Sequence, residues 1–308
     1  MRRLGRLITR MMTCMCGTDT ELTYEWKRNK LYEGDDVMDE SIYNCLVKST
    51  HNSYLQDLQI FGKSTLDSIV YQLNEGVRSI ELDIFKHVDK DVLIVTHGDV
   101  RKHLQGTSYI YLHDVLQLIQ IFAWRDTTLP LFMFIELQIE SEEIDMYIKI
   151  DELIRFYFSA RLFVKKEENN KFTIRDLKGK LLIWCTNSYK NKPEMNEYLN
   201  PFEIRNIPAT HEFSDEDDYT EWNKEHFTRV YPKNKIRSTN YDIHPFIQKG
   251  CQFITINYQT KDNYYYDYQD IFPDNYGIIS YEQALLSDDL THEGSVVTDI
   301  HTVDLENI

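Results

Sequence analysis

Four oxygen-bearing side chains lie in or directly after short apolar stretches in the first half of the chain: Asn52, Glu81, Asp83 and Glu136. Alternate residues of a strand share a face, so a strand through Glu81 and Asp83 presents both carboxylates on one side. Two adjacent carboxylates repel each other unless a cation lies between them. With Glu136 and the amide oxygen of Asn52 they form an all-oxygen set, which suits calcium, fits magnesium less well and is wrong for zinc.

Two histidines accompany these oxygens. His51 directly precedes Asn52, and His97 follows another apolar stretch. Because imidazole titrates near neutral pH, a histidine can donate a hydrogen bond to a phosphoryl oxygen or protonate a leaving alkoxide. Two histidines facing a cation are therefore typical of phosphodiester cleavage. Surface or structural positions are expected for several others of the ten histidines, namely His87, His103, His113 and His226.

Apolar strands alternate with amphipathic helices around these residues, which predicts an α/β fold with a parallel sheet. The apolar periodicity predicts helices over 64–75, 112–124 and 142–158. Strands are expected at 45–49, 77–85, 92–96, 131–137, 180–184, 227–232, 251–258 and 277–280. About eight strands are the number that closes a TIM-type (β/α)8 barrel, and barrel enzymes place their chemistry at the carboxyl ends of successive strands.

Two segments interrupt this alternation. Residues 187–226 contain three prolines and the acidic run 215–218, so we interpret them as a linker that need not be ordered throughout. The tyrosine-rich cluster 264–268 is expected to be a loop or strand edge. Residues 287–308 form an acidic, flexible tail.

Composition limits the partners of the chain. A formal charge of −16 and a pI near 5.1 weigh against nucleic acid, although a local basic patch or a bound cation can still meet a phosphorylated head group. Five scattered cysteines without paired zinc spacing favour a reducing, cytoplasmic compartment. The basic, apolar segment 1–17 predicts either a membrane-surface helix, with Cys14 or Cys16 acylated, or a disordered tail.

Several motifs, taken in order, resemble the catalytic barrel of eukaryotic-type phosphoinositide-specific phospholipase C. The first half, called X in that family, matches at 49–55 (Ser-Thr-His-Asn-Ser-Tyr-Leu), 76–83 (Gly-Val-Arg-Ser-Ile-Glu-Leu-Asp) and 96–98 (Thr-His-Gly). The second half, called Y, matches at 229–232 (Arg-Val-Tyr-Pro), 238–241 and 250–260. The resemblance implies a basic lead-in at 1–40, an X half at 41–186, the linker at 187–226 and a Y half at 227–286, whose match begins as early as 207.

The resemblance also implies an activity, namely calcium-dependent cleavage of phosphatidylinositol or its 4,5-bisphosphate to diacylglycerol and inositol phosphate through a cyclic phosphate. His51 and His97 would be the catalytic pair, and Glu81 or Glu136 would take the proton of the inositol 2-hydroxyl. The calcium ligands would be Asn52, Glu81, Asp83 and Glu136. The inositol ring and its phosphates would contact Ser214, Arg229 and Tyr231. The enzyme would act as a peripheral protein on a phosphoinositide membrane.

The chain departs from the family pattern where lysines usually bind ring phosphates, because Trp184, Cys185, Thr186 and Asn187 stand there. Ile60, Phe61 and Ile236 match an apolar rim that enters the membrane. Two alternatives stay open. A glycerophosphodiester phosphodiesterase shares the Glu-x-Asp motif and the two histidines, and a catalytically silent phosphoinositide-binding or scaffolding protein would keep the barrel without turnover.

Overall fold

The computed structural model of the 308-residue chain describes residues 35–57, 62–98, 108–140, 142–165, 171–185, 195–214, 216–233, 238–272 and 276–287. Several sequence predictions fall outside these residues. They include the basic segment 1–17, the position of His103, the apolar rim at Ile60, Phe61 and Ile236, and all but the first residue of the acidic tail 287–308.

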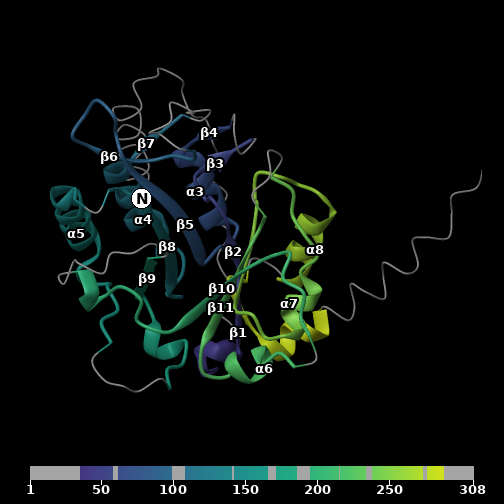
Figure 1. Cartoon of the computed structure of the whole chain (residues 1–308). Helices are drawn as coiled ribbons and strands as arrows, with labels where there is room; N and C mark the ends of the chain where they lie inside the picture. The colour runs from purple at the N-terminus through teal and green to yellow at the C-terminus, as the bar shows by residue number, and fades with distance from the viewer. Residues whose placement is uncertain are drawn as a thin grey trace, which may run out of the picture.

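Seven parallel strands in the described part of the chain form the central sheet: β2 (Ser49–Thr50), β5 (Ser79–Lys86), β8 (Leu131–Gln138), β9 (Leu181–Cys185), β10 (Ile204–Pro208), β11 (Phe227–Tyr231) and β12 (Phe253–Ile256). Their order in space is β10-β11-β12-β2-β5-β8-β9, and Figure 1 shows the sheet curling around a common axis. An isolated parallel bridge joins Ile183 of β9 to Leu199, which precedes β10. The predicted TIM-type α/β barrel is thereby confirmed.

Two predicted barrel strands run in other directions. β6 (Leu93–Val95) is antiparallel to β5 and pairs on its other side with β7 (Ile110–Tyr111). β13 (Ile278–Ser280) is antiparallel to β1 (Cys45–Val47). A short hairpin joins β3 (Leu55–Gln56) and β4 (Lys63–Ser64). An apolar run does not encode the direction in which its strand pairs, which is why the sequence placed 92–96 and 277–280 in the barrel.

The interpretation of 187–226 as a linker was wrong for part of that segment. β10 pairs in register with β11, from Ile204 opposite Phe227 to Pro208 opposite Tyr231, so it is a strand of the barrel. A short helix, α6 (Tyr219–Trp222), follows. Most side chains of β10 are only half-buried, which removes the apolar alternation by which a strand is recognised.

Helices cover the outside of the sheet, and their bounds are α2 (Asp35–Met38), α3 (Leu66–Asn74), α4 (Leu112–Phe122), α5 (Ile144–Phe158), α7 (His244–Gln248) and α8 (Asn263–Ile271). Short 3-10 helices are η1 (Ile42–Asn44), η3 (Arg175–Leu177) and η4 (Met195–Glu197). The three predicted helices are confirmed as α3, α4 and α5, which pack side by side (Figure 1).

The tyrosine-rich cluster 264–268 lies in α8 rather than in a loop. Asp262 caps that helix because its carboxylate accepts a hydrogen bond from the Tyr265 N–H at 3.0 Å. Tyr265 and Tyr268 are buried on the inner face of the helix, whereas Tyr264 and Tyr266 are exposed. The prediction of a loop or strand edge is therefore wrong, because tyrosines at helical spacing supply the buried face of this helix.

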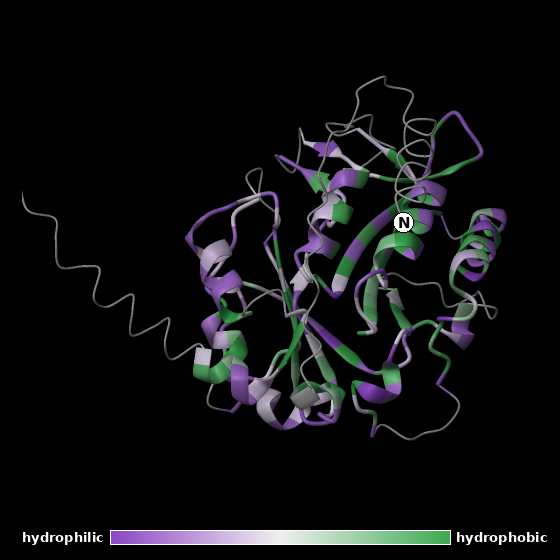
Figure 2. Cartoon of the chain, turned by 180° about the vertical axis from the view of Figure 1, so that it is seen from behind, coloured by the Kyte–Doolittle hydropathy of each residue, from purple (hydrophilic) through white to green (hydrophobic). Residues whose placement is uncertain are grey.

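Strand alternation determines which side chains enter the barrel. Phe134 of β8 and Trp184 of β9 stack at 5.4 Å between ring centroids, and Phe227 and Phe253 complete the aromatic core below the site. Two residues further along each strand the inward position is polar: Glu136 follows Phe134 in β8, and Arg229 follows Phe227 in β11. Figure 2 shows hydrophobic residues along the central strands and more hydrophilic residues in the loops at their ends.

Candidate active site

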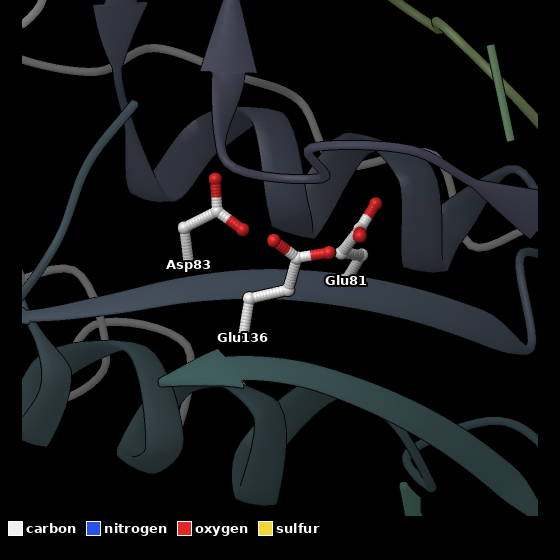
Figure 3. A group of neighbouring side chains, drawn as sticks. All are labelled: Glu81, Asp83 and Glu136. Atoms are coloured by element: carbon white, nitrogen blue, oxygen red, sulfur yellow. The ribbon is translucent and has the colours of Figure 1, made fainter. Parts of the chain in front are cut away.

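Three carboxylates meet above the aromatic core. Glu81 and Asp83 project from β5, and Glu136 projects from β8, where it is paired in register with Asp83. One oxygen of each carboxylate lies within 4.8 Å of the others. Figure 3 shows the three side chains pointing toward one another from the two strands. Glu81 and Asp83 are buried and Glu136 is half-buried. Three negative charges this close and this shielded from water require a compensating cation or shared protons.

Asn52 joins these carboxylates through an unusual backbone conformation. Its φ of 47° lies in the left-handed region, which asparagine tolerates better than most residues. Its backbone N–H donates to Glu81 Oε2 at 3.2 Å, so the turn after β2 is tied directly to the site. Its side-chain nitrogen lies 3.4 Å from Nδ1 of His97.

The oxygens fit a hard divalent cation. The Tyr54 hydroxyl lies 2.8 Å from Asp83 Oδ2 and 3.2 Å from Asn52 Oδ1. Because one hydroxyl has one proton, the shorter bond to Asp83 leaves the amide oxygen of Asn52 with an available lone pair. Asp83 Oδ1 is buried and has no hydrogen-bond partner within the described residues. A buried carboxylate oxygen left in this way is expected of a calcium or magnesium ligand.

The two histidines approach the carboxylates from different sides. His51 Nε2 lies 3.8 Å from Glu81 Oε2, and His97 Nδ1 lies 3.5 Å from Asp83 Oδ2. Burial lowers the pKa of His51, and the charge of Glu81 opposes only part of that effect. His51 is therefore mainly neutral at neutral pH. His97 reaches the site although β6 is antiparallel, because the end of β6 lies opposite Ile84, next to Asp83.

Arg229 of β11 places one positive charge beside the three carboxylates. Its guanidinium donates to Glu81 Oε1 at 2.5 Å, and it lies 4.9 Å from the ring centroid of Phe134. Burial alone raises the pKa of Glu81, but Arg229 and His51 outweigh that effect and hold the pKa below its ordinary value. The residue expected to bind a substrate phosphate is thus paired with a carboxylate in this structure.

The other two predicted substrate contacts differ in their surroundings. Tyr231 ends β11 and is half-buried, with its ring centroid 5.7 Å from the Arg229 guanidinium. Ser214 is exposed in the loop after β10, and its backbone N–H donates to Asp217. Among the described residues, no hydrogen bond or ion pair connects Ser214 to the carboxylates or histidines. The structure therefore brings Tyr231, but not Ser214, into contact with the rest of the site.

Sequence reasoning assigned no role to two residues that touch the site, Tyr54 and Asn257. Asn257 accepts from or donates to the ring of His51 across 3.0 Å, and Tyr54 orients Asp83. Asn257 directly follows β12, just as His51 directly follows β2. The rule that polar residues end the barrel strands therefore would have found Asn257 had it been applied to the second half of the chain.

Trp184, the first residue of the stretch in which the resemblance implies lysines, is buried. It is 1% exposed, donates its indole N–H to Phe202 O at 2.9 Å and stacks on Phe134. The position is thus part of the aromatic core rather than of the site.

Within the described residues, no helix has the length and apolar character required to cross a bilayer.

Comparison with known proteins places these features in a family. Residues 38–186 match the sequence model of the phosphatidylinositol-specific phospholipase C X domain, and residues 182–279 match that of the Y domain. A human relative, 1-phosphatidylinositol 4,5-bisphosphate phosphodiesterase eta-1, is 26% identical over 261 residues, covering 83% of this chain and 13% of its own. The bovine beta-1 enzyme is 20% identical over 323 residues, covering 74% of this chain and 26% of its own. The chain thus spans about an eighth to a quarter of the length of these relatives.

Solved structures share the fold. The crystal structure of L. pealei PLC21 has a TM-score of 0.67 and 20% identity, with 79% of this chain and 37% of that chain covered. A calcium-dependent phosphoinositol-specific phospholipase C from Pseudomonas sp. has a TM-score of 0.52 and 13% identity, with 82% of this chain and 99% of that chain covered.

Proposed function

The chain belongs to the phosphatidylinositol-specific phospholipase C family, and on that premise we propose that it is a calcium-dependent phosphoinositide phospholipase C. One observation carries the proposal: the carboxylates of Glu81, Asp83 and Glu136, two of them buried and that of Glu136 half-buried, converge beside two histidines. The matches to both the X and the Y domain support this activity over the glycerophosphodiester phosphodiesterase alternative.

Four residues would hold the calcium ion: Asn52, Glu81, Asp83 and Glu136. When bound there, calcium would lower the pKa of the inositol 2-hydroxyl and offset the charge that grows on the phosphoryl oxygens. The orphaned Asp83 Oδ1 and the lone pair of Asn52 Oδ1 support this ligand set.

The chain's own residues would move the protons. The inositol 2-hydroxyl loses its proton to a carboxylate, and its oxygen forms a bond to phosphorus while the bond to the glycerol oxygen breaks. Either Glu81 or Glu136 is the acceptor, and Arg229 already engages Glu81 and lowers its pKa. His97 gives a proton to the departing diacylglycerol oxygen, and His51 stabilises the pentacovalent centre. Water then opens the cyclic inositol phosphate.

Arg229 and Tyr231 would bind the inositol ring and its phosphates, with Ser214 approaching from the loop after β10. Arg229 suits a phosphate because its planar guanidinium donates two parallel hydrogen bonds. The buried Trp184 offers no charge at the position where the family usually has a lysine. We therefore propose phosphatidylinositol itself as a substrate alongside its phosphorylated forms, cleaved by a cytoplasmic protein that associates peripherally with the membrane.

The test is an assay of the purified chain on vesicles containing phosphatidylinositol, its 4-phosphate or its 4,5-bisphosphate. We expect release of inositol phosphate and diacylglycerol in calcium and none in EGTA. Release that persists undiminished in EGTA would reject the calcium mechanism. Binding to these vesicles without any product would instead support the silent binding-protein alternative. The matched control is Asp151→Asn, because Asp151 is a carboxylate of α5 outside the site.

A further inference from the structure

The imidazole of His51 is held between the catalytic carboxylates and an asparagine of the second half of the chain. Nδ1 lies 3.0 Å from Asn257 Oδ1, whereas Nε2 lies 3.8 Å from Glu81 Oε2. Asn257 is 1% exposed, so water does not compete for this hydrogen bond. Each ring nitrogen therefore has its own surroundings, and Nε2 is the one directed at the site.

The orientation of the Asn257 amide decides which nitrogen of His51 carries a proton. Asn257 Nδ2 donates to the carbonyl oxygen of Thr239 at 3.2 Å, and a carbonyl oxygen can only accept. The amide oxygen of Asn257 must therefore be the atom that faces His51. Since that oxygen also can only accept, Nδ1 of His51 is the donor and bears the proton. In the neutral ring, the lone pair is then on Nε2.

A second asparagine fixes the position of Asn257. Asn240 Oδ1 accepts from the Asn257 N–H at 2.7 Å, and Asn240 Nδ2 lies 3.3 Å from the Asn257 carbonyl oxygen. Asn240 itself is held by Asp262, whose two carboxylate oxygens accept from its side-chain and backbone nitrogens at 3.0 and 2.9 Å. Because Asp262 also caps α8, the amide of Asn257 is anchored to a helix rather than to a free loop.

We propose that Asn257 is a positioning residue that fixes the tautomer and ring orientation of His51, and that Asn240 holds Asn257 in place. An amide does this without adding a charge to a site that already has three carboxylates. The consequence for the proposed function, on which this inference rests, is that the substrate meets the Nε2 side of His51.

The tautomer can be measured without substrate or calcium. Long-range 1H–15N correlation spectra of the chain labelled with 15N-histidine distinguish the two neutral tautomers, and the loss of one signal set in His51→Ala assigns His51. We expect only the Nδ1–H tautomer in the native chain. In Asn257→Ala we expect a substantial Nε2–H population, and in Asn257→Asp, which keeps an acceptor oxygen, the Nδ1–H form.

Turnover adds a second readout. Asn257→Ala should lower kcat by on the order of 10- to 100-fold with little change in KM, as for other residues that orient a catalytic group. Asn223→Ala is the matched control, because Asn223 is also buried in a hydrogen-bond network, to Lys249 and Thr228, but lies outside the site. It should change neither the tautomer nor kcat.

The results separate the inference from the proposed function. A native chain that shows the Nε2–H form, or an Asn257→Ala protein that retains pure Nδ1–H, overturns the inference even when the chain hydrolyses phosphoinositides. A tautomer change in a chain without turnover supports the inference and rejects the proposed activity. If Asn257→Ala does not fold by circular dichroism, Asn257→Ser takes its place, because its shorter side chain retains polarity without reaching His51.

Discussion

Replacing Arg229 by methionine tests whether the buried charges of the site compensate one another. Arg229 and Glu81 are each 2% exposed, and their nearest side-chain atoms lie 2.5 Å apart. Removing one partner of a buried ion pair costs about 3 to 5 kcal/mol, because the other charge is left uncompensated. In Arg229→Met the Glu81 carboxylate also remains beside Asp83 and Glu136. We expect the unfolding free energy of the calcium-free variant to fall by about that amount.

Calcium should restore much of this loss, since it supplies the missing positive charge at the same carboxylates. A ligand at 100 times its Kd stabilises the folded state by about 2.7 kcal/mol. The gain should be larger in Arg229→Met than in the native chain, because calcium there does not compete with a guanidinium for Glu81. Urea unfolding followed by tryptophan fluorescence, in EGTA and in saturating calcium, measures both quantities.

Arg175→Met is the control for this experiment. Arg175 pairs with Asp39 at 2.7 Å, but the two side chains are 51% and 73% exposed, so we expect little or no loss of stability and no calcium dependence. The reasoning is refuted if Arg229→Met is no less stable in EGTA than Arg175→Met. It is also refuted if calcium stabilises Arg229→Met no more than the native chain. In Glu81→Gln/Arg229→Met the loss should be smaller than in Arg229→Met, since the Glu81 carboxylate is no longer left buried without its partner.

His97→Ala should lower turnover at least about 100-fold while circular dichroism and vesicle binding stay unchanged, and an active variant would contradict its role as the acid. Asn52→Ala should raise the calcium concentration for half-maximal activity about 10- to 100-fold, whereas His51→Ala should turn over slowly even at saturating calcium. Identical calcium titrations of the two variants would argue against separate roles for Asn52 and His51. Burial lowers the pKa of Lys48 to about 8, partly opposed by Glu75, so the charged folded state carries a cost that is full below pH 8 and shrinks as pH rises above 8 toward the ordinary lysine pKa of 10.5. Between pH 7 and 9 the native chain should therefore gain about 1 kcal/mol of unfolding free energy relative to Lys48→Met, and parallel pH profiles would contradict this.

The site residues of the first half could be predicted because their signals are local. Glu81 and Asp83 occupy alternate positions of one strand, which places both carboxylates on one face without knowledge of the fold. Asn52 and Glu136 follow the same rule, since each lies at or after the end of an apolar strand. The roles of all these residues in catalysis and metal binding remain predictions.

Long-range pairing could not be read from the sequence. Nothing near Arg229 indicates that its partner is Glu81, 148 residues earlier, rather than a substrate phosphate. The direction of β6 and the place of β10 in the barrel also depend on which strand lies alongside each of them. In β10, half-buried side chains weaken even the local alternation of apolar residues that would indicate a strand. Ser214, whose assignment depended only on resemblance, is the predicted contact for which the described structure offers no link to the site.

The position of β2 between β12 and β5 has a consequence for the newly synthesised chain. His51 and Asn257 are 206 residues apart, an interval that a ribosome covers in roughly 10 to 40 s at typical elongation rates. During that time β2 has an unpaired edge, and the three carboxylates of the first half have emerged before their counter-ion Arg229. Barrel closure must therefore be a late folding event. The first half of the nascent chain carries the three carboxylates before Arg229, which stabilises them, has been synthesised.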